Sequence, residues 1–218
     1  MILVFIGGAR IKHVLLSLTA LIPALLIYMV SAEYRMKRIL SFVGFGGDES
    51  VTTTANYQLL QGIIGFGNGG VFGVGMGQSK QRDLFLPESY GDFIFAIVGE
   101  EYGLIGTIIF MALFLTILLR GLKIAKYAPD DFGKYLAIGI TSTIVLYAVA
   151  NALVTLGLMP TTGVPMPFVS YGGTAIIFSS FAVGVLLNIS SQTDLHPRER
   201  EFVERTVVKI EPAVGKIY

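Results

Sequence analysis

The sequence predicts an all-α polytopic membrane protein with about four transmembrane helices and a remnant of a fifth. Its composition is the first observation: 53% of the 218 residues are hydrophobic and 14% are charged, against roughly 25% charged in soluble domains. The second observation is the mean hydropathy, +0.70, which is typical of a membrane protein. The third is a set of charge-free stretches long enough to cross the hydrocarbon core, which takes about 20 helical residues.

Each span is predicted from one such stretch. The predicted spans are 13–32, 93–119, 136–156 and 173–189. Pro23 lies inside the first span and predicts a kink there. The last two spans come from 135–193, which contains no Asp, Glu, Lys or Arg and is too long for one helix. Three prolines between 160 and 167 divide it, because they cannot lie together in one regular helix.

Basic residues near the span ends predict the orientation. Lys and Arg precede the first span, separate the second from the third, and recur in the tail 190–218. Loops rich in these residues stay in the cytoplasm, so the tail is expected there. Residues 33–91 then form a long extracytoplasmic loop within a single membrane domain, 1–218. The opening MILVFIG resembles the end of an earlier helix, so the chain is expected to belong to a longer protein.

The composition also excludes several classes of function. No basic block with interleaved aromatic residues is present, so nucleic acid is not an expected partner. The sequence has no cysteine, which excludes disulfides, thiolate metal sites and a cysteine nucleophile. His13 and His196 are isolated in the sequence, so neither indicates a metal site.

The cations and the glycine-rich run of the external loop each allow two interpretations. Its cations would lie among lipid headgroups or bind a diphosphate-linked sugar. The candidates for diphosphate binding are Arg35, Arg38, Lys80 and Arg82. The run GFGNGG, 65–70, formally matches G-x-G-x-x-G, but no strand precedes it. It therefore predicts turns and close backbone packing, with contact between backbone N–H groups and a diphosphate as the alternative.

Asp92 is the most informative single residue. On an ideal helix it shares one face with small residues, which would let a helix or a ligand approach closely. These small residues are Ala96, Gly99, Gly103 and Gly106. The carboxylate is thus expected to point into the bundle, although it could instead cap the helix. Glu100 and Glu101 lie deeper, and a structural ion pair with an unseen helix is expected for them.

Two blocks of sequence resemble the SEDS family of FtsW and RodA proteins. They are LPESYGDFIFAIVGEEYGLIG (86–106) and PTTGVPMPFVSYGGT (160–174). Supporting matches are YRMKRILSF (34–42) and NYQLLQGIIGFGNGGVFGVGMGQSKQ (56–81). GQSKQ and PTTGVP look more like the FtsW branch than the RodA branch. Family members have more spans than are predicted here, so the chain resembles the C-terminal half.

The resemblance implies a peptidoglycan glycosyltransferase of the bacterial cytoplasmic membrane, with lipid II (an undecaprenyl-diphosphate-linked disaccharide peptide) as substrate. The implied partners are a class B penicillin-binding protein and other division or elongation membrane proteins. The family motif P-E-x-x-x-D-F-I-F places the catalytic aspartate at Asp92, although Tyr90-Gly91 stand where the family has His-Thr. The residues expected to form the motifs and shape the cavity are Pro87, Glu88, Glu100, Pro160, Pro167, Ser170, Tyr171, Gly172 and Gly173.

The expected chemistry is displacement at the anomeric carbon of one lipid-linked disaccharide by the 4-hydroxyl of another, with Asp92 as general base. The diphosphate leaving group needs charge neutralisation, so one carboxylate suffices. No cofactor is evident, although a divalent cation could share the diphosphate charge. Two other functions stay open. A transporter of lipid-linked precursors would want charges at the bilayer midplane, and a division scaffold would use Asp92 only as a cap.

Overall fold

The computed structural model describes residues 7, 11–31, 36, 54–86 and 90–193, and every regular element within them is a helix. The elements are α2 (Ile11–Val30), α4 (Thr54–Gly69), the short π-helix η2 (Gln81–Phe85), α5 (Ile94–Lys126), α6 (Asp131–Thr155) and α7 (Gly173–Ser191). The predicted all-α class is therefore confirmed for the described part of the chain.

Three helices, α5, α6 and α7, are long and apolar enough to cross a membrane. They coincide with three of the predicted spans, which identifies an integral membrane protein. Helix α5 extends further than predicted, to Lys126, because basic residues in its last turn complement the helix dipole. Helix α6 begins early because the Asp130 side chain caps it by accepting a hydrogen bond from the Gly133 N–H at 3.2 Å.

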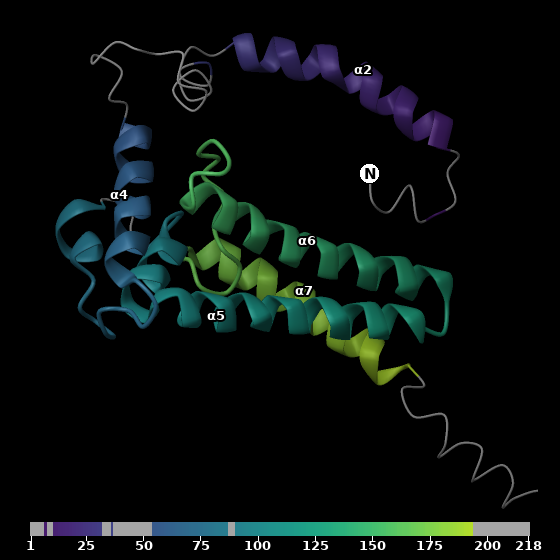
Figure 1. Ribbon diagram of the computed structural model, residues 1–218. Helices are drawn as coiled ribbons and strands as arrows, with labels where there is room; N and C mark the ends of the chain where they lie inside the picture. Colours follow the sequence, from purple (N-terminus) through teal and green to yellow (C-terminus); the bar gives the residue numbers. More distant parts are fainter. Residues whose placement is uncertain (1–6, 8–10, 32–35, 37–53, 87–89, 194–218) are drawn as a thin grey trace, which may run out of the picture.

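Helix α2 occupies the position of the remaining predicted span and contains Pro23. Its apolar run, Thr19–Tyr28, is shorter than a full span. It lies apart from the other helices (Figure 1). The fourth span therefore stays a prediction, and so does the external loop, since most of 32–53 lies outside the described residues.

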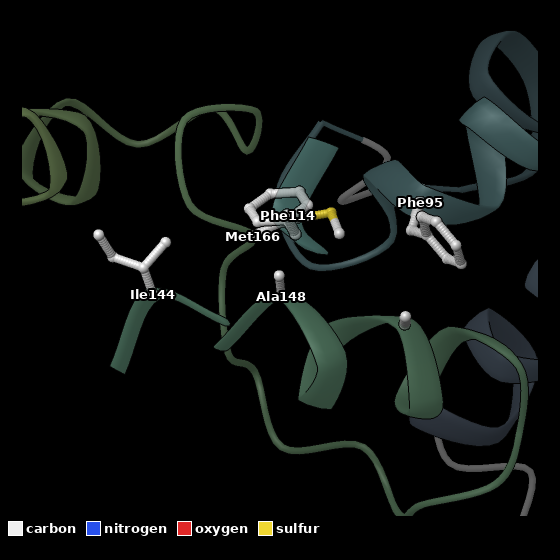
Figure 2. Close-up of a cluster of buried hydrophobic side chains, with 6 residues drawn as sticks. Phe95, Phe114, Ile144, Ala148 and Met166 are labelled. Atoms are coloured by element: carbon white, nitrogen blue, oxygen red, sulfur yellow. The ribbon is translucent and has the colours of Figure 1, made fainter. Parts of the chain in front are cut away.

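Helices α5 and α6 run side by side in opposite directions, with α7 packed along them (Figure 1). Helix α4 stands at the end of this bundle where α5 begins and α6 ends. One apolar cluster joins α5, α6 and the segment between α6 and α7. Its buried members are Phe95, Phe114, Ile144, Ala148, Ala152 and Met166. Figure 2 shows Met166, which is fully buried, reaching in beside Phe114. Burying such a side chain stabilises by about 1.5–3 kcal/mol, so Met166 anchors the 160–172 segment to the bundle.

Helix α5 is broken at Gly103, whose φ of 67° and ψ of −163° are not helical. The segment 70–75 enters the break and replaces the lost helical hydrogen bonds. The four replacement bonds are Val74 N to Glu100 O (3.0 Å), Gly75 N to Glu101 O (3.1 Å), Leu104 N to Gly70 O (2.9 Å) and Ile105 N to Val71 O (3.2 Å). Non-helical backbone at membrane depth requires such internal partners. The predicted small-residue face is wrong beyond Gly103, because it assumed one ideal helix.

Glycine makes this insertion possible. A Cβ on Gly73 (φ 82°) would lie 2.1 Å from the Glu101 carbonyl oxygen, and one on Gly103 would lie 2.4 Å from the Gly73 nitrogen. Neither contact is sterically allowed, and both residues have the positive φ that glycine tolerates. Within the run 65–70 itself, a Cβ on Gly69 would lie 2.0 Å from the Gly99 carbonyl oxygen, which confirms the predicted close backbone packing there. The turns begin after Gly69, because 65–69 is helical.

Candidate functional site

Asp92 lies just before α5, one residue ahead of the N-cap residue Phe93. It is half-buried, at the end of the bundle where the 160–172 segment passes. Its place is set by hydrogen bonds to the main chain around it rather than by helix geometry alone.

Three successive backbone carbonyls, those of residues 90–92, each accept a hydrogen bond from a distant part of the chain. We call this arrangement the carbonyl clamp. Its bonds are Tyr171 N to Tyr90 O (2.6 Å), Ser170 Oγ to Gly91 O (2.7 Å) and Asn151 Nδ2 to Asp92 O (2.8 Å). The clamp fixes the backbone before α5 to α6 and to the segment that leads into α7.

Two of the clamp donors also organise the 160–172 segment itself. Ser170 Oγ accepts a hydrogen bond from Met166 N at 2.7 Å, and Asn151 donates its second amide hydrogen to Val164 O at 2.8 Å. Ser170 and Asn151 are 0% and 1% exposed. Leaving a buried partner without its hydrogen bond costs about 1–3 kcal/mol, so both donors contribute to a fixed geometry.

The Asp92 carboxylate lies beside a glycine turn of the same segment. Its Oδ2 is 3.4 Å from the position that a Cβ on Gly163 would occupy. Gly163 has a φ of 70°, which favours glycine, so the turn brings bare backbone close to the carboxylate. Larger residues at this position would both strain the turn and crowd Asp92.

The other predicted motif residues of this segment are distributed around the same turn. Pro160 is half-buried and Pro167 is buried, whereas the Tyr171 side chain is 86% exposed. Gly172 is the N-cap residue of α7 and Gly173 is its first residue. The structure thus brings Ser170 and the Tyr171 backbone to the two residues just before Asp92, while the Tyr171 side chain is exposed. Pro87 and Glu88 lie outside the described residues.

Glu100 and Glu101 form a second polar site, at the break in α5. Glu100 is 1% exposed, and its carboxylate accepts hydrogen bonds from Ser79 Oγ, from Gln81 N at 3.1 Å and from Asn68 Nδ2 at 3.5 Å. These donors are all neutral, so the expected ion pair of Glu100 is not found among the described residues and stays a prediction. Glu100 is predicted among the motif and cavity-shaping residues. In the structure it belongs to this separate hydrogen-bond network and makes none of the clamp bonds.

Glu101 does form an ion pair, with its oxygen 3.0 Å from Arg82 Nη1. The partner lies in η2 rather than in another transmembrane helix. Arg82 also donates to Asp83 at 2.8 Å and to the Gly77 carbonyl at 3.0 Å. The hydrogen bond between Arg82 and Asp83 raises the pKa of the Arg82 guanidinium and lowers the pKa of the Asp83 carboxyl. The guanidinium is thus already engaged within the chain.

Of the other predicted cations, Lys80 is exposed between the buried residues Ser79 and Gln81. Arg35 and Arg38 lie outside the described residues. In the described ranges, no group of three or more His, Asp or Glu side chains is placed to hold a metal ion.

A separate cavity of about 870 Å³ opens between α4, α5 and α6 near the break. Its lining is almost wholly apolar and includes Phe66, Val71, Leu104, Met111, Leu115 and Val149. Asp92 is not among the lining residues. Since Thr107 is its one polar side chain, this cavity has no group suited to acid–base chemistry. The candidate catalytic site is therefore Asp92 at the carbonyl clamp, and not this cavity.

Comparison with known proteins gives a consistent set of relatives. The FtsW/RodA/SpoVE family model, described as "Cell cycle protein", matches residues 1–195. A probable peptidoglycan glycosyltransferase FtsW of Geobacter metallireducens is 41% identical over 191 residues, which cover 88% of this chain and 50% of the relative. Stage V sporulation protein E of Bacillus subtilis is 43% identical over 190 residues, which cover 87% and 51%. The chain spans about half the length of these curated relatives.

The fold also matches a solved structure. That structure is described as "Structural coordination of polymerization and crosslinking by a peptidoglycan synthase complex". The match has a TM-score of 0.65 and 22% sequence identity, and it covers 87% of this chain and 52% of the other. At this identity the likeness concerns the fold.

Proposed function

Since this chain belongs to the FtsW/RodA/SpoVE family of cell cycle proteins, we propose that the complete protein is a peptidoglycan glycosyltransferase. It would polymerise lipid II into glycan strands at the outer face of the bacterial cytoplasmic membrane, with its C-terminal tail in the cytoplasm. Relatives named probable peptidoglycan glycosyltransferase FtsW, at about 40% identity, support the reaction class. The proposed role in cell division rather than elongation rests on the GQSKQ and PTTGVP motifs.

The observation that carries the proposal is the carbonyl clamp. It holds Asp92 by its main chain, at the end of the bundle and beside the Gly163 turn, while leaving the residue half-buried. A general base must keep a fixed position and still be reachable by substrate. Asp92 satisfies both requirements better than Glu100, whose carboxylate is fully enclosed.

In the proposed reaction, Asp92 accepts the proton of the 4-hydroxyl of one lipid-linked disaccharide. The hydroxyl oxygen forms a bond to the anomeric carbon of a second disaccharide. The bond from that carbon to the diphosphate breaks, and the diphosphate leaves on its lipid with the electron pair. Proton transfer of this kind contributes about 10²–10⁴-fold to a rate.

The departing diphosphate requires positive charge. Among the described residues, the exposed Lys80 is proposed to bind the diphosphate. Arg35 and Arg38 are proposed for the same role from the sequence. Arg82 is the weakest candidate because Glu101 and Asp83 already bind it. A divalent cation could share the charge. A class B penicillin-binding protein is the proposed partner, in keeping with the pairing of polymerisation and crosslinking described for the similar structure.

Replacement of Asp92 by Asn in the complete protein tests the proposal. We expect the formation of glycan polymer from purified lipid II to fall by about 10²-fold or more, while the clamp still holds the backbone of residue 92. Asp131→Asn is the matched control, because Asp131 is an exposed carboxylate in the first turn of α6 at the other end of the bundle.

Three other outcomes would redirect the assignment. Polymerisation that survives Asp92→Asn would remove Asp92 as the base. Wild-type protein that moves lipid II across vesicle membranes but forms no polymer would favour transport instead. Absence of both activities, with partner binding intact, would favour a scaffold.

A further inference from the structure

Asn151 is a fully buried amide in a helix that is otherwise largely apolar. It lies near the C-terminal end of α6 and is 1% exposed. Buried polar groups in such surroundings are costly unless they are bonded, so they mark positions where a fixed geometry is needed. Nothing in the charge pattern of the sequence points to this residue.

Both amide hydrogens of Asn151 are used to join two separate segments. Nδ2 donates to Asp92 O and to Val164 O, each at 2.8 Å. Its Oδ1 is buried and has no hydrogen-bond partner among the described residues. Evidently the side chain is oriented for its two donations at the expense of its acceptor.

These two carbonyls belong to the two segments that meet at the Asp92 carboxylate. One belongs to Asp92 itself, and the other belongs to the residue that follows Gly163, next to which Oδ2 lies. A single planar amide therefore sets the separation between the carboxylate and the Gly163 turn. We propose that Asn151 is a positioning residue that holds Asp92 at the correct distance from the 160–167 turn, where the acceptor hydroxyl of the sugar binds. This inference rests on the proposed function.

Loss of Asn151 should be a local event. The other two clamp bonds, from Ser170 and from the Tyr171 backbone, still hold residues 90 and 91, and Met166 still anchors the segment. The Asp92 and Val164 carbonyls alone would lose their donor. A shift of about 1 Å at a reacting group can reduce a rate by 10²-fold, so the effect should fall on turnover.

Asn151→Leu in the complete protein, assayed with purified lipid II, is the first test. We expect kcat to fall by about 10–10²-fold, with little change in KM. Thr155→Val is the matched control, because Thr155 lies one turn further on α6 and is equally buried, and within the described residues it donates only to carbonyls of α6 itself. It should keep the wild-type kcat.

Asn151→Asp provides a second test with almost the same side-chain shape. A carboxylate cannot donate to the two carbonyls, whereas the protonated acid can donate once. Of the described residues bonded to Asn151, which are Asp92, Val164 and Thr155, only Asp92 has an ionisable side chain. The new carboxyl is the more buried of the two and should take up the first proton. The ratio of variant to wild-type kcat should therefore rise as the pH is lowered from about 8 to 6.

Several results would overturn the inference. They are a wild-type kcat in Asn151→Leu, a ratio for Asn151→Asp that does not change with pH, or loss of the folded protein in both variants while Thr155→Val folds. Each of these leaves the proposed function standing if Asp92→Asn is inactive. Activity in Asp92→Asn would instead remove the general base itself.

Discussion

Asp92 and Glu100 are two carboxylates at the same end of α5, and the protein holds them in opposite ways. At Asp92 the described hydrogen bonds from α6 and the 160–172 segment go to backbone carbonyls. At Glu100 they go to the carboxylate itself, from Ser79, Gln81 and Asn68. One residue is fixed by its main chain and the other by its side chain.

This difference separates a chemical role from a structural one. A carboxylate that already accepts three hydrogen bonds and is 1% exposed has little capacity left to accept a substrate proton. Glu100 instead holds the residues that lead into η2, and with Glu101 it closes the helix break. At Asp92 the clamp holds the backbone through its carbonyl oxygen, whatever the carboxylate itself contacts. This arrangement fits the proposed use of the Asp92 side chain in chemistry.

The largest expected effect tests the Glu100 region without touching the clamp. Gly73→Ala would place a Cβ 2.1 Å from the Glu101 carbonyl oxygen, at a φ of 82°. Strain and overlap should together destabilise the protein by about 2–5 kcal/mol. Thermal unfolding in detergent would measure this. Gly67→Ala in α4 is the control, because no atom lies within 4 Å of its Cβ position and helix propensity favours Ala. Equal melting temperatures for the two variants would mean that the 70–75 segment does not fill the break.

An intermediate effect is expected for Glu100→Gln. The amide oxygen can still accept from Ser79 and Gln81, but without the charge, so stability should fall by about 1 kcal/mol. Turnover per folded molecule should remain close to that of the wild type, in contrast to Asp92→Asn, which should lose turnover while the clamp still holds the backbone of residue 92. Parallel melting and lipid II assays of the two variants would decide. An inactive but stable Glu100→Gln would reverse the roles assigned to the two carboxylates.

The sequence predicts the parts of this fold that are local. Helices α5, α6 and α7 follow from apolar length, because a charge-free run needs no partner to be recognised. The break at Gly103 could not be predicted in this way, since glycine alone is tolerated in a helix. The break depends on the 70–75 segment, which lies far away in sequence and supplies the missing hydrogen bonds.

The candidate site likewise contains residues that local sequence indicates and contacts that it does not indicate. Asp92 could be singled out from its motif, and its catalytic role stays a prediction. The sequence indicates that Ser170 belongs to a motif, but it does not indicate the hydrogen bond from Ser170 to the Gly91 carbonyl. Asn151 was missed because a neutral amide carries no charge signal. One buried polar residue in an apolar helix is itself a signal, and it would have identified Asn151 as a bonded position.

The smallest expected effect concerns Arg82, which Asp83 and Glu101 share. Asp83 is 57% exposed at its side chain, against 9% for Glu101, so solvent screens its contact with Arg82 far more. Asp83→Asn should therefore lower the melting temperature less than Glu101→Gln does. The hydrogen bond from Arg82 lowers the pKa of Asp83 from 3.8, so its stabilisation is present at neutral pH. It is lost only as the pH falls below that value, through the pKa of the folded state. Melting curves of both variants between pH 7 and pH 3 would show it. If Asp83→Asn were the more damaging at neutral pH, Arg82 would be held from the surface, and the buried glutamates would not be what fixes η2 to the break.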